Sequence, residues 1–81
     1  MVQTRVAARI KKPIKTNIKI NGKNENVEEA LNLWELAINK KLSPERIVIE
    51  RNLRIVPKEE WKEVVLEEND QIEIISFVGG G

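Results

Sequence analysis

The Asn21-Gly22 pair, placed between two short alternating segments, limits the possible folds of this chain more than any other feature. Before it, Ile18 and Ile20 alternate with polar residues, which is the period of a strand with one buried face. Asn-Gly readily adopts the positive φ angles of a two-residue hairpin turn. The sequence therefore predicts a β-hairpin whose second, more polar strand spans 23–27 at a sheet edge.

Apolar residues after the hairpin recur at spacings of three and four, which predicts a helix with one broad apolar face. Its start has two candidates, Asn26 with Glu29 or Asn32 with Glu35, because each pair resembles a capping box. Acidic residues near the start and lysines near the end predict that the helix finishes near Lys41. The apolar positions are Ala30, Leu31, Leu33, Trp34, Ala37, Ile38 and Leu42.

The second half of the chain contains short extended segments separated by turns. A proline in the first helical position predicts a capped turn at 43–45, and the β-branched run at 47–49 predicts a strand buried on both faces. Another extended piece spans 53–56, and one helical turn spans 57–61. The last strand, 71–78, alternates apolar residues on both sides, so we expect a central strand covered on both faces.

Hairpin, one helix and further strands predict an α+β fold, with a mixed four- to five-stranded sheet curled around one main helix. This order is that of the β-grasp fold. A right-handed crossover through the helix would allow the first and last strands to run parallel at the centre of the sheet. We expect the β-grasp domain to span 14–78, because Pro13 interrupts whatever precedes it.

Charge is unevenly distributed along the chain. Beyond position 20, eight basic residues face all thirteen acidic ones, a net charge of −5. We expect 1–13 to form a basic arm that is flexible or loosely docked, and its role stays open between a solvated leader, a targeting segment and a nucleic-acid contact. Within positions 1–20, all six charged residues are basic: Arg5, Arg9, Lys11, Lys12, Lys15 and Lys19.

Composition removes several classes of chemistry. The 81 residues suffice for one small domain, and no apolar run approaches a membrane span, so we expect a soluble, cytoplasmic protein. The chain has neither cysteine nor histidine, which excludes disulfides, thiolate metal sites and a cysteine nucleophile, and disfavours acid-base catalysis. The sequence thus predicts no catalytic, cofactor-binding or metal-binding residue.

The last predicted strand runs directly into Gly79-Gly80-Gly81. Glycines lack β-carbons, so such a tail can extend through a narrow channel and bring a carboxylate to a distant catalytic centre. The alternative is a frayed terminus. Because cysteine and histidine are absent, the tail favours a carrier that works through the carboxylate of Gly81, which needs neither side chain. We expect 79–81 to be flexible until a partner binds them.

Several segments together fit one known pattern: IKING at 18–22, Leu33 with Glu35-Leu36, SPERIVIERN at 43–52, IVP at 55–57 with Trp61, Asp70, IEI at 72–74 and FVGGG at 77–81. In these residues the chain resembles the sulfur-carrier (ThiS) family of thiamine biosynthesis, which is ubiquitin-like. Two features depart from the pattern. Leu53 stands where the family often has glycine, which predicts a wider turn after Asn52, and the first dozen residues have no counterpart.

The resemblance implies that a ubiquitin-activating-like adenylyltransferase uses ATP and magnesium to adenylate Gly81. Sulfur from a donor such as a cysteine desulfurase would then replace AMP, and a thiazole synthase would consume the resulting thiocarboxylate. The carrier itself would bind no cofactor and catalyse nothing. Its partner-binding tail would be Phe77, Val78, Gly79, Gly80 and Gly81.

Three alternatives to thiazole formation stay open. The same sulfur chemistry could serve molybdopterin synthesis, although the molybdopterin synthase small subunit usually lacks the IVP segment with its tryptophan. A ubiquitin-like protein modifier would form conjugates on lysines. From another class comes a nucleic-acid-binding module using the basic arm, which the acidic body disfavours.

Overall fold

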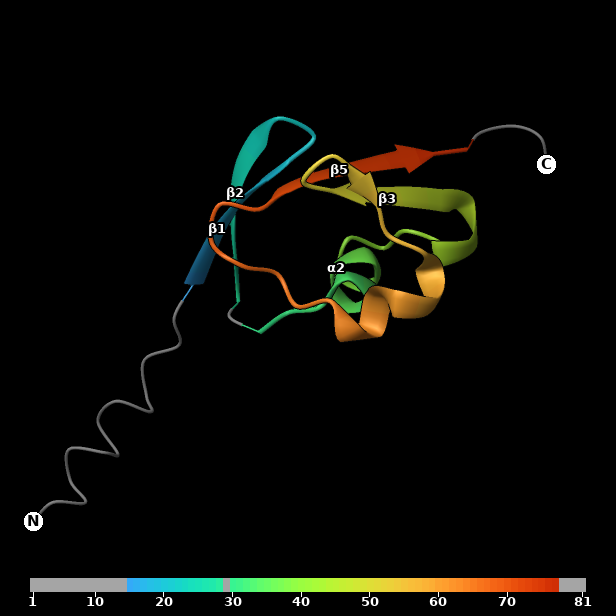
Figure 1. Ribbon diagram of the computed structural model, residues 1–81, viewed down its shortest axis with the longest axis horizontal. Helices are drawn as coiled ribbons and strands as arrows, with labels where there is room; N and C mark the ends of the chain where they lie inside the picture. Colours follow the sequence, from blue (N-terminus) through green and yellow to red (C-terminus); the bar gives the residue numbers. More distant parts are fainter. Residues whose placement is uncertain (1–14, 29, 78–81) are drawn as a thin grey trace, which may run out of the picture.

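The structure, a computed structural model, describes residues 15–28 and 30–77. These form a five-stranded mixed sheet in the order β2-β1-β5-β3-β4, with one α-helix packed against it (Figure 1). The elements are β1 (Lys15–Ile20), β2 (Lys23–Glu28), α2 (Leu33–Asn39), the 3-10 helix η1 (Pro44–Arg46), β3 (Ile47–Arg51), β4 (Arg54–Ile55), the 3-10 helix η2 (Lys58–Glu63) and β5 (Gln71–Ser76).

The predicted hairpin is confirmed. Asn21 and Gly22 have φ angles of 51° and 83°, and the antiparallel register places Ile20 opposite Lys23, so the loop has two residues. Ile18 and Ile20 are buried, whereas β2 is the mostly polar edge strand. The alternation in the sequence thus defines both the turn and the buried face.

The helix begins at the second of the two predicted caps. Glu35 N donates to Asn32 Oδ1 at 2.7 Å, and Asn32 N donates to Glu35 Oε1 at 3.0 Å, which completes a capping box. Asn26 instead lies within β2. The helix ends at Asn39 rather than near Lys41, because Lys41 takes a left-handed φ of 61°. Two turns of helix therefore replace the longer one that the apolar spacing predicts.

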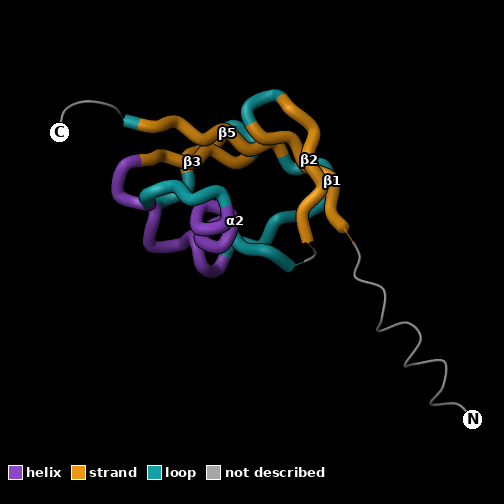
Figure 2. Tube along the Cα trace, turned by 180° about the vertical axis from the view of Figure 1, so that it is seen from behind, coloured by secondary structure: helices purple, strands orange, loops and turns teal. Residues whose placement is uncertain are grey.

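The last strand is central, as predicted, but it is covered on one face. β5 pairs parallel with β1 and antiparallel with β3. Ile72 is 1% exposed on the helix side, whereas Ile75 is 46% exposed on the opposite side. Figure 2 shows the helical segments gathered on one side of the sheet. The expectation of two covered faces is wrong for both β5 and β3, since the described residues supply a single helical layer and leave Val48 only half-buried.

The core lies between the sheet and that layer. Trp61 of η2 is 1% exposed and donates from Nε1 to Val56 O at 2.9 Å, so it fixes the segment after β4 against the sheet. Trp34 is half-buried beside it, with ring centroids 6.4 Å apart. The buried apolar residues are Ile18, Ile20, Leu33, Leu36, Ala37, Ile47, Ile49, Trp61, Leu66 and Ile72.

The turn between β3 and β4 is tight, so the prediction of a wider turn is wrong. Arg51 pairs with Arg54, which leaves two residues in the loop. Asn52 and Leu53 both have positive φ, at 52° and 72°. Leu53 therefore adopts the left-handed backbone that glycine takes without strain, and its side chain is 86% exposed.

Candidate functional site

The candidate site is the base of the carboxyl-terminal tail, where β5 ends. Of the predicted tail residues, Phe77 is described, and Val78, Gly79, Gly80 and Gly81 lie outside the described residues. Phe77 N donates to Arg46 O at 2.8 Å. Arg46 directly precedes β3, so this bond extends the antiparallel pairing of β5 with β3 by one residue. The tail thus departs from a strand that is held in the middle of the sheet.

An apolar strip on the outer face of the sheet leads to this point; we define it as Val48, Ile55, Ile75 and Phe77. Val48 lies directly opposite Ile75, and Phe77 follows Ile75 at a spacing of two, on the same face. Exposure is 46% for Ile75, 65% for Ile55 and 57% for Phe77. Ile55 lies on the same face but opposite Glu50, one position along from Val48 on that face. A group of exposed apolar side chains on one face is typical of an interaction surface.

A side-chain clamp holds the middle of β5 to the first hairpin. Ile74 N donates to Asn21 Oδ1 at 2.7 Å, and Asn21 Nδ2 donates to Ile74 O at 3.3 Å. The backbone pairing between β1 and β5 covers only Gln71 and Ile72 of β5. The Asn21 amide therefore continues the ladder by one further residue, a role that its hairpin motif does not predict.

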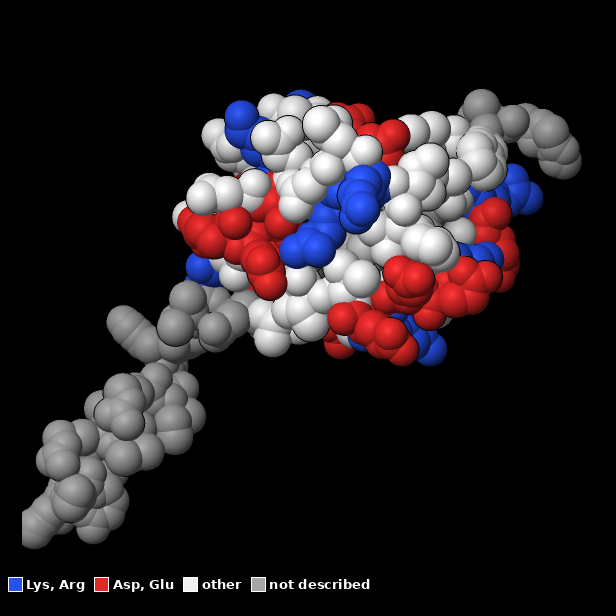
Figure 3. Space-filling view, in the orientation of Figure 1, with Lys and Arg blue, Asp and Glu red and all other residues white. Residues whose placement is uncertain are grey.

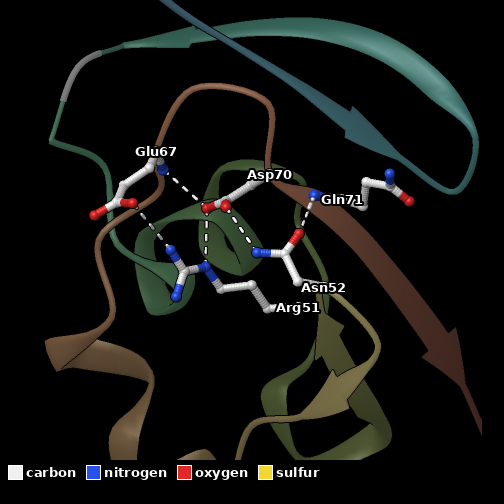
Figure 4. Close-up of polar contacts among 5 residues, drawn as sticks. All are labelled: Arg51, Asn52, Glu67, Asp70 and Gln71. Carbon is white, nitrogen blue, oxygen red and sulfur yellow. Dashed lines mark hydrogen bonds and ion pairs between the residues drawn. The ribbon is translucent and has the colours of Figure 1, made fainter.

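A buried polar network holds the start of β5 (Figure 4). Asp70, 4% exposed, accepts hydrogen bonds from Arg51 Nε at 2.9 Å and Asn52 Nδ2 at 3.0 Å, and from the backbone N–H of Glu67 at 2.8 Å. Asn52 Oδ1 in turn accepts from Gln71 N at 2.9 Å. The network joins the β3–β4 turn to the first residue of β5.

The carboxyl group of Asp70 stays ionised within this network. Burial by itself would raise its pKa, but the hydrogen bonds from Arg51, Glu67 N–H and Asn52, together with the charge of Arg51, lower the pKa below its ordinary value. The pKa of the exposed Glu68 is also lowered, because its carboxylate accepts from the backbone N–H and the side chain of Asn17. Neither group is placed to exchange protons at neutral pH.

Acidic side chains gather over η2 in the view of Figure 3. Glu59, Glu60 and Glu63 are exposed there, on the segment that carries Trp61. They form a charged surface on the helical layer, on the side of the sheet opposite the apolar strip. The strip and the acidic surface are thus separate faces of the domain.

Residues 15–28 and 30–77 contain no cluster of three or more potential metal ligands. In the same part of the chain, no helix is both long and apolar enough to cross a membrane. A cleft of about 480 Å³ opens on the helix side of β5, between the first hairpin and the end of α2. Ile74 and Ser76 line it, so it reaches the base of the tail.

Five strands curled around one helix, with the first and last parallel at the centre, define a ubiquitin-like β-grasp protein. The sequence model of the ThiS family matches residues 8–81. This chain therefore belongs to the ThiS family, as its motifs indicate.

Individual relatives agree with this assignment. The sulfur carrier protein ThiS of Bacillus subtilis is 35% identical over 65 residues, which cover 79% of this chain and 98% of that protein. The crystal structure of the thiamine biosynthesis protein (ThiS) from Geobacter metallireducens superposes with a TM-score of 0.71 at 30% identity, covering 82% of this chain and 100% of the other.

Two relatives are much longer proteins. A thiazole synthase of Magnetococcus marinus is 39% identical over 64 residues, which cover 79% of this chain but 20% of that protein. A thiazole synthase of Paramagnetospirillum magneticum matches at 34% identity with 19% of its length. The chain thus spans about a fifth of the length of the thiazole synthases it matches.

Proposed function

We propose that this chain is a sulfur carrier of thiamine biosynthesis, which holds sulfur as a thiocarboxylate on Gly81. The observation that supports this most directly is the family match, which runs through Gly81. A relative named sulfur carrier protein ThiS aligns over 98% of its length. The exposed apolar strip at the base of the tail fits a protein whose reactive end is handled by partner enzymes.

The chemistry proceeds in two steps. In the first, a carboxylate oxygen of Gly81 attacks the α-phosphorus of ATP, and magnesium pyrophosphate leaves as the acyl adenylate forms. In the second, sulfide, released from the donor's persulfide as two reductant thiols are oxidised to a disulfide, forms a bond to the acyl carbon while the bond from that carbon to the AMP oxygen breaks. The mixed anhydride makes a poor electrophile reactive, so the partner's pocket must exclude water until sulfur arrives.

The carrier contributes position rather than catalysis. Its glycines admit the tail to a narrow pocket, and Phe77 beside them gives a partner an apolar anchor. The partners are a ubiquitin-activating-like adenylyltransferase, which binds ATP and magnesium, a sulfur donor such as a cysteine desulfurase, and a thiazole synthase. The matches to thiazole synthases support delivery of the sulfur to thiazole. We place this cycle in the cytoplasm.

Mass spectrometry of the intact protein tests the proposal. After incubation with the adenylyltransferase, ATP, magnesium and a sulfur donor, the mass should rise by the exchange of one oxygen for sulfur. A variant lacking Gly81 is the control and should keep its mass. An unchanged mass of the full chain, with partners that load another member of the family, overturns the proposal. Stimulation of molybdopterin formation in place of thiazole formation would reassign the acceptor.

A further inference from the structure

The backbone of β5 has one side that lacks a partner strand near its end. Phe77 N donates to Arg46 O, and Asn52 N donates to Gln71 O, so odd-numbered residues of β5 direct their polar backbone groups toward β3. The even-numbered residues direct theirs toward the first hairpin. Ser76 is therefore oriented away from β3.

On the hairpin side, partners are present only for the first part of β5. Asn21 N donates to Ile72 O at 2.8 Å, and the Asn21 side chain then takes both backbone groups of Ile74. Within 15–28 and 30–77, no strand lies opposite Ser76 on this side, because the pairing of β1 with β5 stops at Ile72. Ser76 thus presents one N–H and one C=O at an open edge in the middle of the sheet.

The surroundings of this edge leave space for another strand. The cleft of about 480 Å³ reaches Ser76 from the helix side, and its walls carry the ion pair between Lys40 Nζ and Glu25 Oε2, 3.0 Å apart. On the outer side, Ile75 and Phe77 of the apolar strip flank the same backbone. A strand added here would place alternate side chains against polar groups in the cleft and against the apolar strip.

We infer that an extended segment of the adenylating enzyme adds to the sheet at Ser76, forming main-chain hydrogen bonds with its N–H and C=O. This inference rests on the proposed function, in which that enzyme is the first to bind the end of β5. The occupant presents apolar side chains to Ile75 and Phe77 and polar side chains to the cleft. Strand addition of this kind holds the tail by its backbone, so the carboxylate is aimed by the sheet and not by side-chain contacts alone.

Ser76→Pro tests the inference, since proline removes the N–H and blocks strand approach but is tolerated where that N–H takes no part in the internal ladder. We expect kcat/KM for adenylation, measured by exchange of pyrophosphate into ATP, to fall about tenfold, as the loss of one or two main-chain hydrogen bonds implies. Ser76→Ala, the matched control, keeps the backbone and should match the natural chain. Equal kcat/KM for Ser76→Pro and the natural chain, or an equal loss in Ser76→Ala, overturns the inference.

Hydrogen exchange of the natural chain gives a second measurement that does not depend on any variant folding. The Ser76 amide should exchange fast in the free protein and about tenfold or more slowly in the complex with the adenylating enzyme. Unchanged exchange in the complex overturns the inference, and so does protection in the free protein that grows with concentration, because a second copy would then occupy the edge. If the natural chain is not adenylated at all, the proposed function fails instead.

Discussion

Leu53 occupies a strained left-handed backbone conformation, and its exposed side chain adds no packing that would offset the strain. Its φ is 72°, and 86% of the side chain is exposed. We expect Leu53→Gly to raise the free energy of unfolding by about 0.5–1 kcal/mol, since relief of the left-handed strain exceeds the entropy that glycine adds to the unfolded chain. Urea denaturation measures the change. Leu53→Ala keeps the β-carbon and should stay within about 0.5 kcal/mol of the natural chain; equal stabilities of the two variants would contradict the strain argument.

Asp70 makes stability depend on pH in the acidic range. Because its pKa in the folded protein lies below the ordinary value of 3.8, its contribution is complete at neutral pH and is lost as the pH falls through that value toward the folded pKa. We expect Asp70→Asn to lower the free energy of unfolding by about 2–3 kcal/mol at pH 7, since three donors lose a charged acceptor.

Urea denaturation at pH 7 and at pH 3 checks this expectation, and the difference between Asp70→Asn and the natural chain should shrink at the lower pH. Glu67→Gln is the control, because it keeps the backbone N–H that binds Asp70 and removes only an exposed pair with Arg51 at 3.6 Å. Its effect should stay below about 1 kcal/mol. A difference for Asp70→Asn that is the same at both pH values would argue against an ionised Asp70.

The sequence predicts conformations at this scale better than contacts. Asn21 could be placed in a turn because Asn-Gly favours positive φ locally, but its clamp on Ile74 joins residues 53 positions apart and has no local signal. The sequence likewise places Asp70 in the family motif but predicts no structural role for it, because its bonds to Arg51 and Asn52 join residues far apart in the sequence. At Leu53 the residue type predicts a wider turn, and this prediction is wrong because the pairing of β3 with β4 imposes a tight turn on a residue that disfavours it.

At the scale of elements, α2 depends on one capping box. Asn32 caps the helix through Glu35 and also donates from Nδ2 to Lys62 O at 3.2 Å, which links the start of α2 to η2. We expect Asn32→Ala to lower the free energy of unfolding by about 1–2 kcal/mol, the range for loss of a helix cap. Thermal or urea denaturation measures this loss. The rival cap supplies the control: Asn26→Ala lies on an exposed strand position and should change stability by less than about 0.5 kcal/mol. A larger loss for Asn26→Ala would favour the other cap.

The helix start was ambiguous in sequence because both asparagines have a glutamate three residues later. Extension of β2 to Glu28 resolves the ambiguity, since a residue paired in an edge strand cannot also cap a helix. Ala30 and Leu31 fit the apolar spacing by coincidence, and they lie in the connection from sheet to helix, where Ala30 has a φ of 67°. Periodicity predicted that a helix exists here but not its length.

At the scale of the whole molecule, element order was sufficient to predict the β-grasp fold, the central β5 and the parallel pairing with β1. The sequence does not predict whether the outer face of the sheet is covered. An apolar residue on that face gives the same alternation in the sequence whether another element of the chain or a partner protein packs against it. The sequence predicts a last strand covered on both faces and a partner-binding tail that begins at Phe77; the exposure of Ile75 and Phe77 contradicts the first expectation and supports a docking surface.

The fold as a whole depends on Trp61, which joins η2 and the chain after β4 to the core of the sheet. It is 1% exposed, and its indole N–H is bonded to Val56 O, so Trp61→Ala removes both a large buried side chain and a buried hydrogen bond. The expected loss of about 3–5 kcal/mol is comparable with the entire stability of a domain this small. We therefore expect Trp61→Ala to be largely unfolded at 25 °C by circular dichroism and to lose sulfur loading with it. The control is Trp34→Ala, at a half-buried position under the Lys62 side chain, which should remain folded and be loaded with sulfur. If Trp61→Ala also folds and is loaded, the anchoring of η2 by Trp61 is not required for the carrier.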